Sequence, residues 1–255
     1  MGRAAWDGRS RILAEFGLAV RSHGEELHGA GAVTPHLHVP GTAHLRTSVL
    51  AAWTDHLTGL LAARTMAPRV PVTIELDVHL YGPPPASGDV RGIARTVKAG
   101  RSIFVAEVEF AAGGEPLAFG AASFMVAPDP AVRLPEPLSV DAPAPAGRLS
   151  VPLAERARCA RLEPGKASLP RSEEGLNSSD TVHGGLLALA AEESVLSLAP
   201  GGIVGSLALR YLQAARVGPI VATASLRRGA ARAVLRDSGN GDRAAVMAAA
   251  RTFGP

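Results

Sequence analysis

The chain has 255 residues, of which 47% are hydrophobic and 19% charged, and its formal net charge is +3. This balance provides enough apolar material for a globular core and too little charge for a disordered chain. It argues against a protein dedicated to nucleic acids, because the sequence has no long basic run and only 4% aromatic residues.

Targeting and redox features of the sequence point to the cytoplasm. The first sixteen residues contain no apolar leader segment, and no stretch approaches the ~20 uninterrupted apolar residues of a membrane span. Cys159 is the only cysteine, which rules out an internal disulfide framework and a cysteine-based zinc site. We therefore expect a cytoplasmic protein with no membrane partner and no metal.

The first half of the chain opens with a strand candidate near residues 16–20, followed by a helix over residues 46–63. The helix is apolar nearly all round, as expected of a helix wrapped by a curved sheet. After it, alternating apolar and polar residues predict four antiparallel strands joined by turns. These turns fall at Gly82-Pro83, Lys98-Ala99-Gly100 and Ala112-Gly113-Gly114.

A proline-rich stretch then divides the chain almost at its midpoint. Between residues 128 and 147 the sequence places six prolines among small residues. Such a composition is typical of a semi-rigid linker. We therefore predict an N-terminal domain over residues 11–127, a linker over 128–148 and a C-terminal domain over 149–255.

The second half repeats the order of the first. A strand candidate near residues 157–169 precedes a helix over residues 183–198, which stops before Pro200-Gly201-Gly202. Four short strands follow, the last two separated by a turn at residues 239–242. The sequence therefore predicts one unit that occurs twice, each copy consisting of a strand, a long helix and four strands.

Aligning the two helices reveals a recurring acid. When Arg46 is placed on His183, Asp55 falls on Glu192, because each acid lies nine residues further along its helix. An acid at one structural position of both copies is a candidate for chemistry. Asp55 is the stronger candidate, since it lies between Trp53 and Leu57 in an otherwise apolar helix, whereas Glu192 belongs to an acidic pair of the kind that commonly faces solvent.

The second helix begins with the more complete motif. Asn177 precedes His183-Gly184-Gly185, and Glu192 follows nine residues after the histidine. This pattern, with four strands after the helix, resembles the hot-dog fold thioesterases of the PaaI-like type, in which Asn-x5-His-Gly-Gly opens the helix and an Asp or Glu follows. In the first half, Pro40 and Arg46 stand where the family has the Asn and the His.

The resemblance implies both a fold class and an activity. The fold class is α+β, with two hot-dog domains in tandem, each a long central helix wrapped by an antiparallel β-sheet, forming an intramolecular pseudo-dimer. The implied activity is hydrolysis of acyl-CoA thioesters, in which CoA is part of the substrate and no separate cofactor takes part. Because the family's active site lies between two units, a tandem chain would have two unlike composite sites.

The first composite site carries the full set of residues that the resemblance implies. In it, Asp55 is the general base or nucleophile, and Thr73 orients that acid or the attacking water. Asn177 positions Asp55 or the water, and His183 shapes the helix start. The backbone N–H of Gly184 would stabilise the oxyanion, because the first amides of a helix have no intrahelical partner and lie at the positive end of its dipole.

The second composite site would combine Glu192 with Pro40, Arg46 and Thr47, so it lacks the Asn and the glycine. We keep Glu192 as a second catalytic candidate but expect this site to be degenerate and structural. For the phosphates of CoA, the candidates are Arg101 and Arg227.

The sequence leaves several questions open. It does not identify the acyl group, the carrier of that group (CoA or an acyl-carrier protein) or the assembly, for which a homodimer of the tandem chain is one possibility. Two other functions compete: a non-catalytic acyl-CoA-binding protein, and a hot-dog enoyl-CoA hydratase, whose Asp-x4-His pattern is missing from the sequence. Convergence of Asp55, Asn177 and Gly184 on one pocket would favour the thioesterase.

Overall fold

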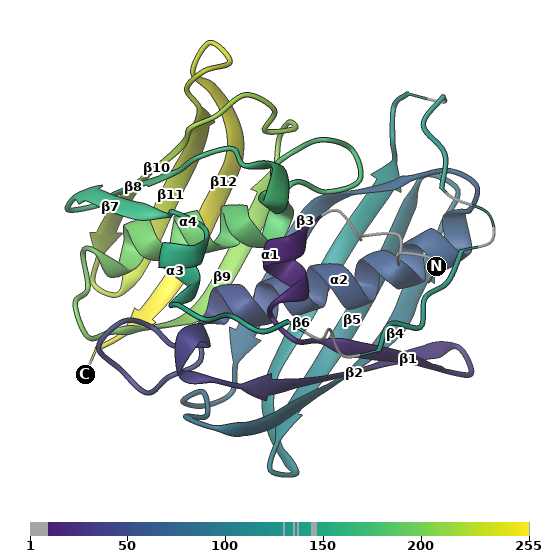
Figure 1. The fold of residues 1–255 in the computed structure, drawn as a ribbon, viewed down its shortest axis with the longest axis horizontal. Helices are drawn as coiled ribbons and strands as arrows, with labels where there is room; N and C mark the ends of the chain where they lie inside the picture. Colours follow the sequence, from purple (N-terminus) through teal and green to yellow (C-terminus); the bar gives the residue numbers. More distant parts are fainter. Residues whose placement is uncertain (1–9, 130, 135, 137, 144–146, 255) are drawn as a thin grey trace.

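A twelve-stranded antiparallel sheet wraps two long helices in this computed structural model (Figure 1). The structure describes residues 10–129, 131–134, 136, 138–143 and 147–254, and the strand count refers to these. The expectation of no apolar leader concerns the first residues of the chain, which lie outside the described residues up to position 9.

The first half contains one long helix and six strands among its described residues. The helix precedes the four longest strands, as the sequence predicts. The elements are α1 (Arg11–Ala14), β1 (Ala19–His23), β2 (Glu26–Val33), η1 (Pro35–Leu37), α2 (Thr47–Met66), β3 (Pro71–Leu80), β4 (Gly88–Ala99), β5 (Ile103–Ala112) and β6 (Glu115–Val126).

The second half repeats every one of these elements in the same order. Its long helix is shorter than that of the first half, and its first two strands are brief. The elements are α3 (Leu153–Arg156), β7 (Ala160–Glu163), β8 (Lys166–Leu169), η2 (Glu173–Gly175), α4 (Gly184–Leu196), β9 (Ile203–Tyr211), β10 (Ile220–Arg227), β11 (Ala230–Asp237) and β12 (Arg243–Phe253).

The order of strands shows how the two copies are joined. The sheet runs β1-β2-β4-β5-β6-β3-β9-β12-β11-β10-β8-β7, so the order read from one edge matches the order read from the other. The two copies meet where β3 pairs with β9, and Asp77 lies opposite Ala208 at the middle of that ladder. The chain is therefore α+β, with two tandem copies related by a pseudo-twofold axis through this ladder.

The region before each long helix differs from the sequence prediction. One strand is expected there, and the structure has a hairpin of two, β1–β2 and β7–β8. In β2 the residues facing α2 include Gly29 and Gly31, where an added Cβ would lie 2.9 Å from Leu57 and 2.7 Å from Trp53. The prediction of a single strand was wrong because glycines in these inward positions hide the alternation that marks a strand.

Both long helices begin one residue later than predicted, with Arg46 and His183 as their N-caps. Their first turns run antiparallel to each other near the middle of the molecule. There Gly185 packs against Ala52, since a Cβ added to Gly185 would lie only 2.6 Å from the Cβ of Ala52. This close approach brings residue 55, one turn further along α2, beside the first residue of α4.

The predicted linker, residues 128–148, is only partly described, because residues 130, 135, 137 and 144–146 lie outside the described set. Its described parts are attached to the first half. Ala142 forms a bridge with Val20, and the carboxylate of Asp141 accepts a hydrogen bond from the Ser22 N–H at 2.6 Å. Leu134 is buried beside Ala63 at the end of α2. The linker therefore packs along the first domain at these points.

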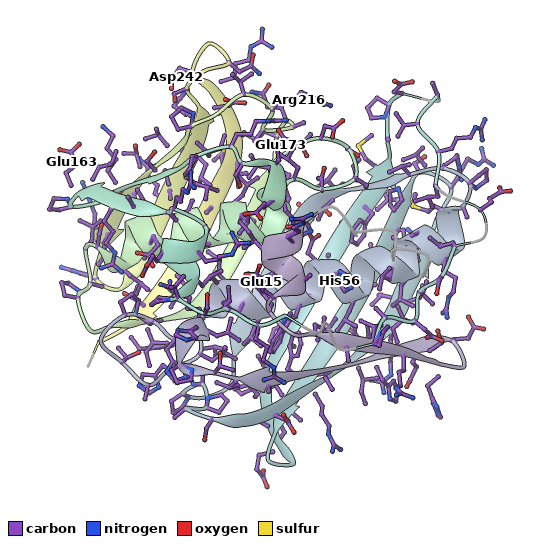
Figure 2. All side chains as sticks on the ribbon, viewed as in Figure 1. Glu15, His56, Glu163, Glu173, Arg216 and Asp242 are labelled. Carbon is purple, nitrogen blue, oxygen red and sulfur yellow. The ribbon has the colours of Figure 1, made fainter. Side chains whose placement is uncertain are left out.

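Ion pairs and a shared core connect the two halves. Arg156 of α3 forms a bidentate pair with Glu15, at 2.7 and 2.8 Å, and a third bond to Glu174 at 2.8 Å. Figure 2 shows Glu15 beside α1, at the junction of the two halves. Most of the buried apolar residues of the two halves form one continuous cluster. Within the described part of the chain, no helix combines the length and apolar character that a membrane span needs.

Candidate active site

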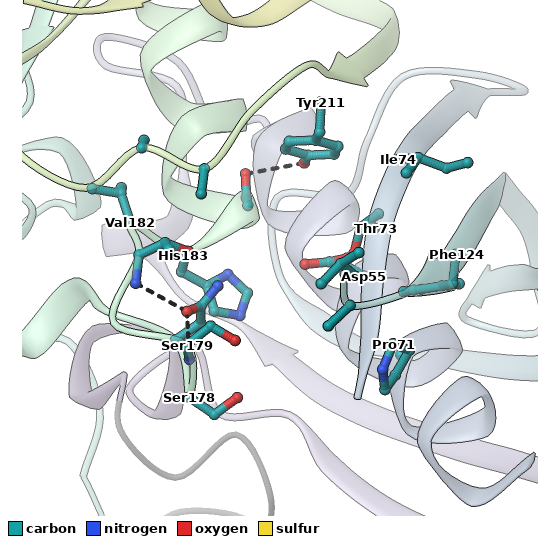
Figure 3. A pocket seen from close by; sticks show the side chains of 18 of the residues that line it. Asp55, Pro71, Thr73, Ile74, Phe124, Ser178, Ser179, Val182, His183 and Tyr211 are labelled. Atoms are coloured by element: carbon teal, nitrogen blue, oxygen red, sulfur yellow. Dashed lines mark hydrogen bonds between the residues drawn. The ribbon is translucent and has the colours of Figure 1, made fainter. Parts of the chain in front are cut away.

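A cavity of about 620 Å³ lies between the two halves (Figure 3). The first half contributes α2, β3 and the end of β6, with largely apolar side chains such as Leu60, Ile74 and Phe124. The second half contributes the loop leading into α4 and the segment that follows β9, which are mainly polar. The wall of the cavity is therefore apolar on one side and polar on the other.

Asp55 enters this cavity from α2. Its side chain is half-buried, and its Oδ1 accepts a hydrogen bond of 2.7 Å from the hydroxyl of Thr73 on β3. The spacing follows from the fold, because β3 returns directly along α2. One oxygen of the carboxylate is thereby fixed by a neutral donor, and Oδ2 is directed toward the second half.

Gly184 stands opposite Asp55 as the first residue of α4. A Cβ added to Gly184 would lie 3.0 Å from Oδ2 of Asp55 and 2.9 Å from the hydroxyl of Tyr211. A glycine is therefore needed for this approach. The N–H of a first helical residue has no acceptor within its own helix and lies at the positive end of the dipole. A carboxylate and a helix N-terminus thus converge from two halves of the chain.

Asn177 and His183 shape the loop that leads into α4. Oδ1 of Asn177 accepts hydrogen bonds from the N–H groups of Ser179 at 2.9 Å and Thr181 at 3.2 Å. The side-chain NH2 of Asn177, which lines the cavity, is the donor that it can offer to water or substrate. His183 is buried, and its Nδ1 accepts from the Gly185 N–H at 3.0 Å as the N-cap of α4.

Tyr211, at the end of β9, also reaches the cavity, and sequence reasoning missed it. Its hydroxyl donates to the carbonyl oxygen of Gly184 at 3.3 Å. Burial and the neighbouring charge of Asp55 raise the pKa of Tyr211 well above its ordinary value. The sequence held one signal. Tyr211 is one of only two tyrosines in the chain, and it is the last residue of a strand with alternating apolar and polar residues.

The pseudo-twofold axis generates a second site, which is filled. Glu192 is fully buried, and its Oε1 accepts from the Thr47 N–H at 2.9 Å and the Ser48 N–H at 3.3 Å. Its Oε2 accepts from the Ser48 hydroxyl at 2.6 Å and from Nη1 of Arg46 at 3.1 Å. We call this set, Arg46, Thr47, Ser48 and Glu192, the closed site, and the set around the cavity, Asp55, Thr73, Asn177 and Gly184, the open site.

Arg46 closes this second site by occupying the place that His183 has in the open site. The guanidinium is fully buried and also forms an ion pair with Glu193, which is held in turn by Arg161 at 2.6 Å. Burial alone would lower the pKa of Arg46, but Glu192 and Glu193 outweigh it and raise the pKa. The first two amides of α2, those of Thr47 and Ser48, are thus occupied by a carboxylate of the protein, whereas in α4 the second amide, that of Gly185, donates to its own N-cap side chain.

A shared irregularity aligns the strands of the two sites. Where β3 and β9 pair with β6 and β12, each has one extra residue, Ile74 in β3 and Gly205 in β9. Superimposing these extra residues places Thr73 on Val204 and Tyr211 on Leu80. The closed site therefore has no strand hydroxyl equivalent to that of Thr73, and it also lacks the tyrosine; the hydroxyl on its acid comes from Ser48 of α2.

The two arginines considered for CoA phosphates do not line the cavity. Arg101 is exposed in the turn between β4 and β5. Arg227 is exposed as the last residue of β10. The cavity is bordered instead by the exposed Arg216, whose Nη1 donates to the carbonyl of Ser179 at 3.3 Å. No group of metal-binding side chains is found in the described ranges of the chain.

Comparison with known proteins finds one family model, and it matches part of the first half. Residues 43–118, which include α2 and Asp55, match the model of the thioesterase superfamily. No curated protein sequence matches the chain.

Solved structures match nearly the whole chain at low identity. A 12:0-ACP thioesterase from Umbellularia californica has a TM-score of 0.65 at 11% identity, covering 92% of this chain and all of that one. An acyl-ACP thioesterase from Bacteroides thetaiotaomicron has 0.62 at 13% identity, covering 90% and 98%. A tesB protein from Mycobacterium avium subs paratuberculosis has 0.62 at 16% identity, covering 97% and 99%. These similarities show a double hot-dog fold.

Proposed function

We propose that the chain is a member of the thioesterase superfamily, whose model matches residues 43–118, and that it hydrolyses acyl-CoA thioesters at the open site. The observation that carries this proposal is the convergence of Asp55 and Gly184 from different halves of the chain. Oδ2 of Asp55 lies 3.0 Å from the position of a Cβ on Gly184, in a cavity large enough for an acyl group and part of its carrier. A carboxylate facing a helix N-terminus has the elements that thioester hydrolysis requires.

The thioester carbonyl binds with its oxygen toward the N–H of Gly184. As a nucleophile attacks, negative charge develops on that oxygen, and the helix-start amide stabilises it where the dipole is positive. A donor that is already fixed in place costs no reorganisation during the reaction. Mutation of comparable donors costs about 10²- to 10³-fold in rate.

Asp55 supplies the base. In the simplest route, Oδ2 accepts a proton from a water molecule while the water oxygen forms a bond to the carbonyl carbon. The tetrahedral intermediate then collapses, the C–S bond breaks, and the thiolate leaves and takes up the proton from Asp55. In the alternative, Asp55 attacks the carbonyl directly and a mixed anhydride is hydrolysed in a second step. Thr73 orients the carboxylate in both routes.

The two sides of the cavity suit the two parts of the substrate. The apolar side, with Leu60, Ile74 and Phe124, accepts the acyl group. The polar side leads out past Asn177 to Arg216, where a guanidinium can pair with a phosphate of CoA. Two of the solved structures similar in fold are described as acting on acyl-ACP, so the carrier must be tested directly.

The test is release of free thiol by the full chain from acetyl-, octanoyl-, palmitoyl- and phenylacetyl-CoA and from octanoyl-ACP. We expect hydrolysis of at least one CoA ester, with octanoyl-CoA preferred over octanoyl-ACP in kcat/KM, and a weaker KM for CoA esters in Arg216→Gln. Activity on the ACP ester alone would contradict the choice of carrier. Binding of CoA esters without release of thiol from any substrate would contradict hydrolysis and favour a binding protein.

A further inference from the structure

We propose that the hydroxyl of Tyr211 is the second hydrogen-bond donor to the thioester carbonyl, acting beside the N–H of Gly184. This inference rests on the proposed function, because it assigns a role within the same site. Thioester hydrolysis uses a pair of donors for the developing oxyanion, and at the start of α4 the second amide, that of Gly185, is already bonded to Nδ1 of His183. Tyr211 lines the cavity and supplies the other.

The geometry places Tyr211 where the reacting carbonyl must lie. The position of a Cβ on Gly184 is 2.9 Å from the Tyr211 hydroxyl and 3.0 Å from Oδ2 of Asp55. The phenol oxygen of Tyr211, a neutral donor, and the carboxylate oxygen Oδ2 of Asp55 therefore lie on the same side of Gly184. A carbonyl carbon within reach of Asp55 has its oxygen near both the phenol and the helix start. Figure 3 shows the Tyr211 hydroxyl directed toward α4 above Asp55.

The hydroxyl is available to a substrate. Its present bond to the carbonyl oxygen of Gly184 is 3.3 Å long, whereas O–H···O bonds are commonly about 2.7–2.8 Å. An incoming carbonyl at normal distance can replace this weak bond. Burial and the charge of Asp55 raise the pKa of Tyr211, so the phenol keeps its proton at neutral and mildly alkaline pH. A neutral donor is the form that an oxyanion needs.

The asymmetry of the two sites is an independent reason for the assignment. None of the four residues of the closed site is among the described residues that line the cavity. At the position of Tyr211, this site has Leu80. The tyrosine thus occurs in the copy that retains the glycine opposite its acid. A tyrosine that served only the packing of this fold would be expected in both copies, since β3 and β9 occupy equivalent places in the sheet.

The test compares Tyr211→Phe with Tyr81→Phe, a matched control. Tyr81 is 55% exposed on the outside of the sheet, where its hydroxyl contacts only Glu109 among the described residues. Turnover is measured by thiol release from the best substrate of the panel. Binding is measured with two non-hydrolysable probes: octyl-CoA, a thioether without the carbonyl, and a ketone analogue in which a methylene replaces the thioester sulfur.

We expect Tyr211→Phe to lower kcat by about 10²-fold, and Tyr81→Phe to match wild type. In Tyr211→Phe, binding of the ketone should weaken while binding of octyl-CoA stays the same, a difference that a packing role would not produce. Wild-type turnover that persists in Tyr211→Phe would overturn this inference alone, as would equal weakening of both probes. If wild type hydrolyses no thioester, the proposed function and the inference both fail.

Discussion

Asp55 depends on Thr73 for its orientation. The Thr73 hydroxyl donates to Oδ1 at 2.7 Å, which leaves Oδ2 as the oxygen that faces Gly184. A half-buried carboxylate with one oxygen fixed loses little rotational freedom when the substrate binds, and orientation of this kind contributes to rate rather than to affinity. In the closed site the equivalent strand position is Val204, and there the acid is held by Arg46 instead.

Replacing Thr73 with Val should lower kcat by about 10- to 100-fold, because the carboxylate loses its fixed rotamer. Stability should fall by only about 1 kcal/mol, the value of one hydrogen bond. Thr223→Val, at an exposed position of β10, is the matched control for loss of a strand hydroxyl. Steady-state kinetics and urea unfolding measure both quantities, and an unchanged kcat would contradict the role of Thr73.

The two glycines at the start of α4 should respond differently to alanine. In Gly184→Ala, the new methyl meets the Tyr211 hydroxyl and the Asp55 carboxylate, so activity should fall about 10- to 100-fold with little loss of stability. In Gly185→Ala, the methyl meets Ala52, including its backbone, so stability should fall by about 1–3 kcal/mol. The same assays test this contrast, and a large stability loss in Gly184→Ala would contradict it.

The sequence indicated some of these residues and missed others for identifiable reasons. Asp55 lies at the same position in its helix as Glu192 in the other, and Gly184 belongs to the His-Gly-Gly motif, so both were candidates from the sequence. Tyr211 lies at a strand end, where no spacing rule connects it to a helix start. Arg101 and Arg227 were predicted to bind phosphate because of their positive charge. The charge of a residue does not indicate which end of a strand borders the cavity.

At the scale of elements, the first turns of α2 and α4 perform different tasks. The start of α4 faces a cavity, whereas the start of α2 is covered by Glu192 and Arg46. A buried charge that is paired and hydrogen-bonded is tolerated, but removal of one partner leaves the other uncompensated. We therefore propose that the closed site holds the two helices together rather than supporting chemistry.

Arg46→Met should lower the free energy of unfolding by about 3–5 kcal/mol, because it leaves Glu192 and Glu193 buried without their shared cation. The control is Arg95→Met, which breaks a solvent-exposed pair with Glu26 and should cost about 1 kcal/mol or less. Urea unfolding followed by circular dichroism measures both variants. A loss below about 1 kcal/mol in Arg46→Met would show that the buried network contributes little.

Element boundaries follow from the sequence where side chains alternate or caps are clear. The helices begin within one residue of their predicted starts, because Gly-Thr and His-Gly-Gly segments mark them. The hairpins β1–β2 and β7–β8 were not resolved as two strands, since Gly29 and Gly31 remove the inward side chains and β7 and β8 have only four residues each. Short strands with glycines give little periodicity to detect.

At the scale of the whole molecule, the two copies share a sheet and a core. The ladder between β3 and β9 makes the sheet continuous, and Arg210 crosses it to pair with Glu75 at 3.0 Å and Asp77 at 2.9 Å. The buried cluster includes residues of both long helices. A boundary drawn at the proline-rich linker divides the sequence, whereas the cores on the two sides of it are in contact.

Thermal unfolding should therefore show one cooperative transition, in which the calorimetric and van't Hoff enthalpies agree. Independent halves would instead give two transitions, and calorimetry of the full chain distinguishes these outcomes. Hydrogen exchange gives a second readout: the most protected amides of α2 and α4 should exchange with the same free energy of opening. A stable half with an unfolded partner would contradict the shared core.

The tandem arrangement could be predicted from the sequence because the helix and four strands recur with a common acid. The continuous sheet could not, since pairing between two edge strands depends on three-dimensional approach and leaves no local pattern. The asymmetry of the two sites was partly visible in Arg46 and Pro40. The ion pairs that fill the closed site required the structure, because Glu192 and Glu193 have the sequence signature of a solvated acidic pair.

The most direct test of the composite open site is thiol release by Asp55→Asn and by Glu192→Gln, compared with wild type on the best substrate of the panel. The control Asp77→Asn removes an acid from the β3–β9 ladder, where its partner is Arg210. We expect a loss of about 10²- to 10⁴-fold in Asp55→Asn, the contribution of a general base, and activity within about 3-fold of wild type in folded Glu192→Gln. Loss of turnover in Glu192→Gln with turnover retained in Asp55→Asn would contradict this expectation.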